Sequence, residues 1–341
     1  MKHRLALIGF GNVGQGLVSI LAEKRQALVR DHGFECDIVA ISDMLKGTLL
    51  DPKGLDPQIL AALPGGKLDS YPGGAKGGDA LAVIRDSNAT VVAEATYTDL
   101  KTGEPATGYI KAAFETGKHV VTTNKGPLAL HYSELRDLAV ARNLQFRFEG
   151  TVMSGTPLLS FGMKNLEGCQ ISEIRGILNG TTNFILTEME RGGSYADALK
   201  KAQELGYAEA DPTGDVEGFD TMGKVLILAN VFMEGKLKKE EIQRKGITGI
   251  TTDDIKRAAS EGKRWKLIGR LRRDGDRVVG SVAPEALPAS NPLTSASGAT
   301  NAVQFATDLL GEVTVVGAGA GRRETGFAIL ADLLDINRSL R

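Results

Sequence analysis

The stretch RLALIGFGNVG at residues 4–14 decides the fold of the N-terminal part of the chain. A short apolar run, typical of a buried parallel strand, leads directly into glycines 9, 11 and 14. Apolar residues then recur at Val13, Leu17, Leu21 and Leu28, which predicts one face of a helix. In such a GxGxxG turn the glycines allow a tight bend, close approach of a pyrophosphate and close packing of helix on strand. The helix N-terminus adds N–H groups that favour phosphate, so the stretch predicts a dinucleotide-binding unit.

The choice between NAD and NADP turns on the end of the second predicted strand, DIVAIS at 37–42. Asp43 follows this strand, where a carboxylate accepts hydrogen bonds from ribose hydroxyls and opposes a 2′-phosphate. That placement favours NAD, but Lys46 is close enough in sequence to meet a phosphate instead. A third interpretation gives Asp43 only a turn-capping role, so the sequence leaves both coenzymes open.

Working outward from the glycine turn, strands and helices alternate as far as residue 150. The predicted strands are 4–10, 37–42, 90–95, 119–123 and 144–150, and the predicted helices include 79–87, 105–117 and 128–143. Residues 63–78 are glycine-rich and are predicted to form irregular loops. This alternation predicts an α/β fold with a Rossmann-type, doubly wound parallel sheet.

The second half of the chain has a different, α+β pattern. A strand at 171–178 precedes helices at 181–192 and 195–205, and a long apolar helix is predicted at 218–233. Strands 265–274 and 277–287 have no helix between them, so we expect them to pair antiparallel. We predict a nucleotide-binding domain over 1–149 and a second domain over 150–317, and a helical segment closes the chain.

Bulk properties exclude several classes of protein. The formal charge of −1 provides no basic surface for nucleic acid or for an acidic membrane, and no run of 18 apolar residues could span a bilayer. The two cysteines cannot form a disulfide framework, which fits a reducing cytoplasm. Glycine is unusually frequent, at 42 of 341 residues, as expected where backbone approaches ligands at several loops.

Lys125 is the first candidate for chemistry. It lies in TTNKGPLAL at 122–130, where a predicted strand ends and a helix begins. Ligands of doubly wound sheets bind beyond the carboxyl ends of the strands, so Lys125 would face the cleft. The alternative is an ordinary surface lysine.

The stretch GYAEADPTGDVEGFDTMGK at 206–224 contains five carboxylates and ends at Lys224. Asp220 and Lys224 are four residues apart on a predicted helix whose continuation, VLILANVF, is nearly all apolar. A buried lysine needs partners, and carboxylates would raise its pKa, which suits proton donation to a carbonyl that is being reduced. The same acids could hold the ammonium group of a zwitterionic substrate. A solvated acidic loop with a surface ion pair is the alternative.

Two further glycine turns lie in the second half. GILNGTTNFIL at 176–186 places Gly180 and Thr181 at a strand-to-helix junction, another N-terminus that could bind a carboxylate. FEGTVMSGTPLL at 148–159 contains Glu149, whose carboxylate together with backbone carbonyls could bind a cation, although a structural turn is the simpler interpretation.

Taken together, these motifs resemble the homoserine dehydrogenase family. The resemblance runs through nearly the whole chain and includes GFGNVG, TTNKGPLA, FEGTVMSGTPLL, GILNGTTNFIL, LGYAEADPTGDVEGFDTMGK, NPLTSASGATNAVQF at 291–305 and GAGAGRRETGFAILADL at 317–333. It implies NAD(P)-dependent interconversion of L-homoserine and L-aspartate 4-semialdehyde, in the biosynthesis of threonine, isoleucine and methionine. It also implies a homodimer formed through the sheet of the second domain, and a closing helical segment, 318–341, that packs back onto the first domain.

The resemblance assigns roles to individual residues. It implies that Lys125 and Lys224 are the catalytic lysines, and that the substrate is bound by Gly180, Thr181, Tyr207, Glu209, Asp215 and Asp220. Coenzyme contacts are implied for Gly9, Phe10, Gly11, Asn12, Val13, Gly14, Asp43, Thr96, Lys125 and Gly321. A monovalent cation, sodium or potassium, would bind at Glu149, Val152, Ser154 and Thr156, although Met153, Ser154 and Thr156 replace small residues often found there.

The chain also departs from the longer members of that family. It stops at Arg341, so we expect no C-terminal regulatory domain, no threonine feedback through one, and no preceding kinase domain. Two rival functions make different demands on the sequence. A phosphorylating aldehyde dehydrogenase needs a thiolate nucleophile, and neither Cys36 nor Cys169 is placed for attack. A nucleotide-sensing module without catalysis would show gaps in the acidic block at 206–224, and none is present.

Overall fold

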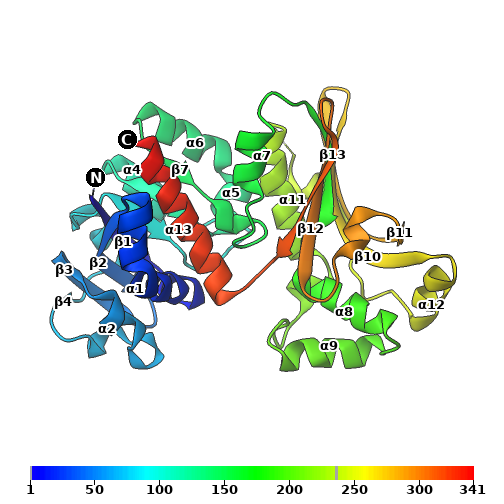
Figure 1. The fold of residues 1–341 in the computed structure, drawn as a ribbon, viewed down its shortest axis with the longest axis horizontal. Helices are drawn as coiled ribbons and strands as arrows, with labels where there is room; N and C mark the ends of the chain where they lie inside the picture. The colour runs from blue at the N-terminus through cyan, green and yellow to red at the C-terminus, as the bar shows by residue number, and fades with distance from the viewer. Residues whose placement is uncertain (1, 235–236) are drawn as a thin grey trace. The chain divides into compact units, whose positions relative to one another are not determined.

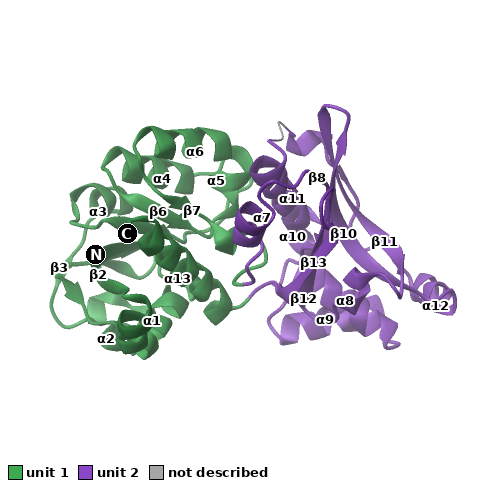
Figure 2. Cartoon of the chain, turned by 45° about the horizontal axis from the view of Figure 1, so that its top comes forward, with its two compact units in different colours: residues 1–155, 321–341 green, residues 156–320 purple. Residues whose placement is uncertain are grey.

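A computed structural model of the protein describes residues 2–234 and 237–341. The chain divides into two compact units, residues 1–155 with 321–341 (unit 1) and residues 156–320 (unit 2), coloured separately in Figure 2. Both termini belong to unit 1, which is therefore built from two separate segments of sequence. In the described part of the chain, no helix is long and apolar enough to cross a bilayer.

Unit 1 is organised around one seven-stranded sheet. Its strands, in the order β4-β3-β2-β1-β5-β6-β7, are Ala75–Lys76, Gly47–Leu55, Glu35–Asp43, Lys2–Ile8, Val91–Glu94, His119–Thr122 and Phe146–Arg147. Five neighbouring strands, β2, β1, β5, β6 and β7, pair in parallel, which confirms the Rossmann-type sheet. β3 and β4 pair antiparallel and form one edge.

The edge strand β3 was not predicted, for a physical reason. Its sequence GTLLDPKGL contains Pro52, Asp51 and two glycines, residues that disfavour strands, and it lacks regular alternation. Proline is tolerated on edge strands, and β3 pairs with only the two residues of β4 on its outer side.

Helices pack on the sheet of unit 1 (Figure 1). They are α1 Asn12–His32, α2 Pro57–Ala61, α3 Ala80–Asp86, α4 Ala106–Glu115, α5 Lys125–Leu130, α6 Tyr132–Ala141 and α13 Arg322–Ser339, with short 3-10 turns at Pro64–Gly66, Leu68–Ser70 and Glu149–Thr151. The core joins β1, β2 and β5 with α1 and α13, and α13 contributes Ile329, Leu330, Leu333 and Ile336. The closing helix is therefore an internal part of unit 1.

Two predictions for unit 1 are wrong in detail. The helix expected at 128–143 is two helices, α5 and α6, because the backbone leaves the helical region at His131. The strand expected at 144–150 is reduced to Phe146–Arg147, since Glu149–Thr151 turns into a 3-10 helix. The glycine-rich region 63–78 is mostly irregular as expected, but it also contributes β4.

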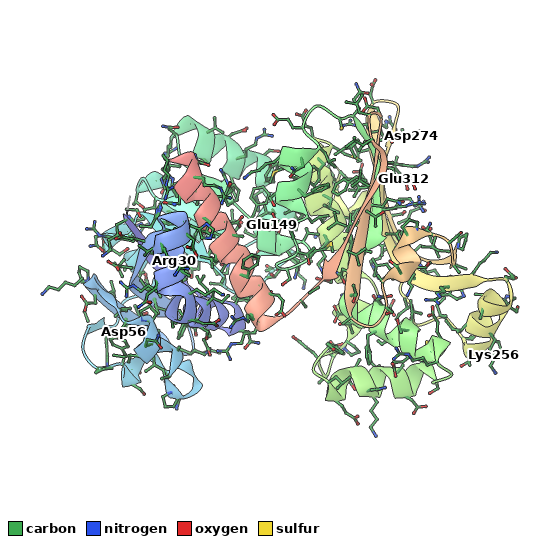
Figure 3. All side chains as sticks on the ribbon, in the orientation of Figure 1. Arg30, Asp56, Glu149, Lys256, Asp274 and Glu312 are labelled. Atoms are coloured by element: carbon green, nitrogen blue, oxygen red, sulfur yellow. The ribbon has the colours of Figure 1, made fainter. Side chains whose placement is uncertain are left out.

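Unit 2 contains a six-stranded sheet in the order β13-β12-β8-β10-β11-β9. The strands are Gly311–Ala318, Thr300–Thr307, Ile171–Ile177, Lys263–Asp274, Arg277–Pro288 and Gln243–Arg244. All neighbours pair antiparallel except β11 with β9. The expected hairpin of β10 and β11 is confirmed, whereas β12 and β13 were not predicted. Figure 3 labels Asp274 at the end of β10 and Glu312 on β13.

The helices of unit 2 are α7 Leu159–Asn165, α8 Gly180–Glu190, α9 Tyr195–Glu204, α10 Thr213–Val216, α11 Phe219–Phe232 and α12 Thr252–Ser260, with 3-10 turns at Lys239–Glu241 and Pro292–Ser295. The long apolar helix predicted at 218–233 is confirmed as α11, which packs on β10 and β11. α8 also packs on β10 and β12. Consequently the N-termini of α8 and α11, which carry the predicted substrate residues, are fixed by the same sheet.

Candidate active site

The glycine turn of unit 1 has the geometry needed at a phosphate site. Gly9 has φ +97°, and a side chain there would collide with the backbone of Ala95 at the end of β5. Gly11 caps α1 without a side-chain hydrogen bond within the described chain, which leaves the first N–H groups of α1 available to a ligand. The sequence therefore folds here into a helix N-terminus that can accept a pyrophosphate.

A cavity of about 690 Å³ lies against this turn, entirely within unit 1. Among the predicted coenzyme residues, its lining includes Gly9, Gly11, Asp43 and Thr96. Phe10, by contrast, is fully buried in the core. Within the described chain, the lining also does not include the other predicted contacts, Asn12, Val13, Gly14, Lys125 and Gly321.

Asp43 is fixed by backbone groups at the rim of this cavity. Its Oδ2 accepts a hydrogen bond from Phe10 N at 2.7 Å, and its Oδ1 accepts from Leu45 N at 2.9 Å and Lys46 N at 3.0 Å. The ammonium of Lys46 donates to Phe10 O at 2.6 Å. The turn-capping role and the cavity position of Asp43 therefore coexist, and Lys46 is tied to the glycine turn.

A buried carboxylate that sequence reasoning missed organises the ends of β5 and β6. Glu94 is fully buried, and its Oε1 accepts from Thr96 N at 2.8 Å while its Oε2 accepts from Thr122 Oγ1 at 2.7 Å. Burial raises the pKa of Glu94, and the hydrogen bonds from Thr96 and Thr122 oppose that rise. Glu94, which is not itself part of the cavity lining, thus fixes Thr96 in the cavity wall through hydrogen bonds.

Lys125 is the first residue of α5 and is held through its neighbour. Asn124 caps α5 by accepting a hydrogen bond from Gly126 N at 3.1 Å, and its amide donates to Tyr97 O at 2.8 Å. Asn124 N in turn donates to Thr122 Oγ1 at 3.0 Å, so this loop is linked to Glu94. A lysine at a helix N-terminus opposes the helix dipole, so the position offers Lys125 no electrostatic stability of its own.

Unit 2 contains the second predicted catalytic lysine, Lys224, in a buried position. Lys224 is only 7% exposed, and its ammonium donates to Leu178 O at 2.5 Å and to Asp220 Oδ2 at 2.7 Å. Asp220 lies one turn earlier on α11, as the sequence predicted. The pairing is therefore buried, not a solvated surface ion pair.

Asp215 joins this group through an asparagine. Asn179 Nδ2 donates to Asp215 Oδ1 at 2.7 Å and to Asp220 Oδ2 at 3.0 Å. Burial raises the pKa of Asp215, the nearby Asp220 raises it further, and the Asn179 and Lys224 groups lower it. We call Asn179, Asp215, Asp220 and Lys224 the acid–lysine cluster.

The remaining predicted substrate residues lie around the N-terminus of α8. Gly180 is the first residue of α8, and Thr181 Oγ1 donates to Tyr207 O at 2.6 Å. The Tyr207 ring is partly exposed and packs against Phe184, with centroids 5.0 Å apart. Glu209 is exposed, and its backbone carbonyl accepts from Gln203. The structure thus brings Gly180, Thr181 and Tyr207 together with the cluster, but leaves the Glu209 side chain at the surface.

The other two acids of the block at 206–224 have structural roles. Asp211 accepts a hydrogen bond from Thr213 N at 3.1 Å, which is a local turn contact at the start of α10. Glu217 accepts from Thr248 Oγ1 at 2.8 Å and so ties the turn before α11 to the segment after β9. Of the five carboxylates, only Asp215 and Asp220 therefore surround the lysine.

The predicted cation loop follows β7. Met153 and Ser154 both have positive φ, 60° and 53°, which is unusual for two consecutive residues with side chains. Ser154 Oγ hydrogen-bonds Thr325 Oγ1 at 2.7 Å, and Thr156 Oγ1 donates to Ala318 O at 2.9 Å. Glu149, labelled in Figure 3, is buried beside Asp332 of α13, and Val152 is buried. Among the described residues, no group of three or more His, Cys, Asp or Glu side chains could hold a metal.

A Rossmann-type sheet with a glycine turn, and a second unit with a buried lysine among carboxylates, define an NAD(P)-dependent oxidoreductase. The family model for the homoserine dehydrogenase NAD binding domain matches residues 9–149, and that for homoserine dehydrogenase matches residues 157–334. The chain belongs to the homoserine dehydrogenase family.

Individual relatives agree with this assignment. The NAD(+)-dependent homoserine dehydrogenase of Pseudomonas canavaninivorans is 48% identical, over 99% of this chain and 97% of its own length. A crystal structure from Archaeoglobus fulgidus, assigned as a homoserine dehydrogenase, has a TM-score of 0.88 at 35% identity and covers 98% of this chain and 99% of its own. A mutant hyperthermophilic archaeal homoserine dehydrogenase in complex with NADPH has a TM-score of 0.86 at 31% identity, covering 99% and 98%.

The function follows from this membership. The protein is an NAD(P)-dependent oxidoreductase that interconverts L-aspartate 4-semialdehyde and L-homoserine, a step toward threonine, isoleucine and methionine. The expectation from the sequence is confirmed at this level.

Proposed function

We propose that the two units divide the reaction between them. Unit 1 holds the coenzyme in the cavity lined by Gly9, Gly11, Asp43 and Thr96, with the pyrophosphate at the N-terminus of α1. Unit 2 holds the amino acid substrate at the acid–lysine cluster and the N-terminus of α8. This division differs slightly from the predicted domains 1–149 and 150–317, because the units change at 155/156 and 320/321.

The state of Lys224 carries the chemical part of the proposal. An ammonium has three donors, and two are taken by Leu178 O and Asp220 Oδ2. The third can point at the substrate oxygen, donating its proton as the aldehyde becomes an alcohol and recovering it in the opposite direction. When bound, a nicotinamide coenzyme would provide the hydride chemistry at substrate C4. For Lys125, the first residue of α5 in unit 1, we propose the catalytic role that the family resemblance implies.

The carboxylates have a separate role in this proposal. Asp215 and Asp220 bind the substrate's ammonium, and the N–H groups of Gly180 and Thr181 bind its carboxylate. Tyr207 and Glu209 complete the rim. Asp220 therefore serves both the substrate and Lys224.

Alanine replacement of each lysine tests the assignment. We expect Lys224→Ala and Lys125→Ala each to lower kcat by about 10²- to 10⁴-fold, as for loss of a proton-transfer group. Lys101→Ala, an exposed lysine in the loop before α4, is a matched control expected to retain activity. If both lysine variants keep near-wild-type kcat, the roles proposed for them are wrong.

We further propose a preference for NAD over NADP. Its support is Asp43, whose carboxylate is fixed at the cavity rim by three backbone N–H groups and would lie against a 2′-phosphate. Homoserine oxidation with each coenzyme should give a higher kcat/KM with NAD. Asp43→Ser should reduce the difference in kcat/KM between NAD and NADP. A wild-type enzyme with a higher kcat/KM for NADP would contradict the proposal.

A monovalent cation, sodium or potassium, is proposed at the loop of Glu149, Val152, Ser154 and Thr156. The support is the buried Glu149 carboxylate and the left-handed backbone at Met153 and Ser154, a conformation that can turn carbonyl oxygens toward one point. The melting temperature should then rise in sodium or potassium chloride relative to tetramethylammonium chloride at equal ionic strength. Equal melting temperatures in all three salts would contradict the proposed cation site.

The assembly proposed is a homodimer in the cytoplasm, formed through the sheet of unit 2. β13 is an edge strand with exposed Val316, and edge strands are protected by pairing or covering. The two thiols, Cys36 and Cys169, are free, as in a reducing compartment. Light scattering should give twice the chain mass of 36.2 kDa, and a monomer would contradict the dimer.

A further inference from the structure

Asn179 lies at the centre of the acid–lysine cluster, and neither its sequence motif nor the proposed roles above account for it. It is 4% exposed and is the N-cap residue of α8. Its Nδ2 reaches carboxylates from two other helices, Asp215 of α10 at 2.7 Å and Asp220 of α11 at 3.0 Å. One amide therefore connects three helix termini across about 40 residues of sequence.

The hydrogen-bonding capacity of this amide is fully used. Oδ1 accepts from Thr182 N at 2.9 Å and from Thr182 Oγ1 at 3.0 Å, which caps the helix. The two hydrogens of Nδ2 are both directed to carboxylates. The capping duty alone would be served equally well by aspartate or serine, so it does not explain an amide at this position.

The carboxylates need what the amide donates. Asp215 and Asp220 are both carboxylates in a partly buried site, and Asp220 raises the pKa of Asp215. The charged groups acting on Asp215 are Asp220 and Lys224, both from α11, while the Asn179 amide and the Thr181 hydroxyl come from the β8–α8 junction. Asn179 is a neutral donor to both carboxylates, so it favours their ionised forms without adding an ammonium that would compete with a cationic ligand.

We propose that Asn179 is a positioning residue for substrate binding: it holds the carboxylates of Asp215 and Asp220 at a fixed separation, so that together they bind the substrate's ammonium group. The inference rests on the proposed role of those two carboxylates. Because the same side chain caps α8, it also fixes this ammonium site relative to the helix N-terminus that binds the substrate carboxylate. Asn179 thereby sets the spacing between the two charged ends of an α-amino acid.

Two substitutions separate capping from bridging. Asn179→Asp keeps a capping oxygen but replaces both amide hydrogens with a third negative charge, and Asn179→Ser keeps a cap without charge. We expect KM for homoserine to rise by about 10- to 100-fold in each, as for lost hydrogen bonds to charged groups, with a smaller change in kcat. Coenzyme KM should not change, since the coenzyme cavity belongs to unit 1.

The pH profile provides a readout that a purely structural role would not move. The acid limb of kcat/KM for homoserine should shift to higher pH in Asn179→Asp, because the added carboxylate makes its neighbours harder to ionise. Asn179→Ser should shift it less, since only the donors are lost. If Asn179→Asp fails to fold, Asn179→Ser alone decides the question.

Asn291→Asp is the matched control. Asn291 is also an N-cap asparagine of unit 2, accepting from Leu293 N at 3.0 Å, at the start of the turn Pro292–Ser295. The Asn291→Asp variant should leave KM for homoserine and the acid limb of kcat/KM unchanged. An equal rise in KM in this variant would overturn the inference, because the effect would then follow from any Asn→Asp change at an N-cap of unit 2.

Parallel measurements on Asp215→Asn and Asp220→Asn distinguish the two levels of the argument. If these variants raise KM while both Asn179 variants match the wild type, the role of Asn179 is refuted and the proposed ammonium site stands. If neither aspartate variant raises KM, the ammonium site itself is wrong, and the role of Asn179 falls with it.

Discussion

Two buried ionisable side chains of this protein, Lys224 and Glu94, have different kinds of hydrogen-bond partner. Lys224 is almost inaccessible to water, yet a carbonyl and a carboxylate oxygen both lie within hydrogen-bonding distance of its ammonium. Glu94 is in the opposite situation: its partners are neutral donors, and burial raises its pKa. These two residues illustrate why a buried ionisable group must be interpreted through its partners.

Glu94 gives a prediction for the pH dependence of stability. Its folded-state pKa is raised above the ordinary value of 4.5, so the folded protein binds this proton more tightly than the unfolded chain. The free energy of unfolding of the wild type, relative to Glu94→Gln, should therefore fall as pH rises above about 4.5. Urea unfolding of both proteins between pH 4 and 8 measures this difference. A difference that grows with pH would mean that the pKa is lowered.

Cys36 should be inert in the folded protein. Burial raises the pKa of its thiol to about 12, so the reactive thiolate is scarce at neutral pH. We expect iodoacetamide at pH 8 to leave Cys36 unmodified until urea is added, and activity to be retained throughout. Peptide mass mapping after alkylation checks this. Fast modification of Cys36 with loss of activity would favour the thiolate chemistry of an aldehyde dehydrogenase.

At the scale of residues, the charged side chains of the acid–lysine cluster could be predicted from the sequence, but the residues that hold the sites together, Asn179 and Glu94, could not. Lys224, Asp220 and Asp215 were predicted from their crowding in one stretch, and they do lie together. Asn179 and Glu94 were missed because an isolated Asn or Glu has no pattern, and because the partners Asp215, Asp220 and Thr122 are distant in sequence. A signal did exist: Asn179 precedes Gly180 at a predicted helix start, where an N-cap is expected. Nothing in the sequence indicated the bridge to two carboxylates.

At the scale of elements, helices α1 and α13 of unit 1 pack closely against each other. A side chain at Gly326 of α13 would lie 2.5 Å from Leu17 N of α1, and one at Gly16 of α1 would collide with the carbonyl of Arg322. Each helix therefore presents a glycine to the backbone of the other. The first helix of the coenzyme site is held in place by the last helix of the chain.

Gly326→Ala tests this contact. Alanine favours helix formation, so an isolated helix would gain stability, but here the added methyl must push two backbones apart. We expect a net loss of about 1–3 kcal/mol, seen as a lower melting temperature and weaker NADH binding. Gly249→Ala, where an added methyl would meet nothing within 4 Å, should be nearly neutral. A neutral Gly326→Ala would show that the helices can separate easily.

Element prediction succeeded where the periodicity was strong and failed where it was interrupted. The buried strands β1, β2, β5 and β6, and helix α11, were predicted because their apolar runs are continuous. β12 and β13 lie among small residues such as those of SASGAT and GAGAG, which resemble loops when read alone. Their pairing with each other and with β8 supplies stability that local sequence does not show.

For the molecule as a whole, the path of the chain matters more than any one contact. The chain leaves unit 1 after Gly155, builds all of unit 2, and returns at Gly321. Glycine-rich GAGAG at 317–321 and MSGT at 153–156 mark the two crossings, and the sequence placed the first boundary near 150. The relation of α13 to the core of unit 1 could be anticipated only from family resemblance, since the helix is about 170 residues from the remainder of that unit.

A chain ending at Ala320 should lose the coenzyme site. Without α13, the core of unit 1 lacks Ile329, Leu330, Leu333 and Ile336, and the exposed faces of α1 and the sheet have no cover. We expect NADH binding to disappear and unit 1 to become sensitive to trypsin. A chain ending at Ser339, which lacks only two residues, is the control and should still bind NADH. Binding by the shorter chain would show that α13 is dispensable.

The return of the chain to unit 1 also affects how the protein is made. Synthesis on a ribosome proceeds from the N-terminus, and domains generally fold as they emerge. Here the first segment to emerge cannot complete its core until the final helix has been translated, whereas unit 2 is continuous and can fold earlier. Unit 1 therefore stays incomplete until α13 has emerged from the ribosome, and during that interval its exposed apolar surface is a target for chaperones.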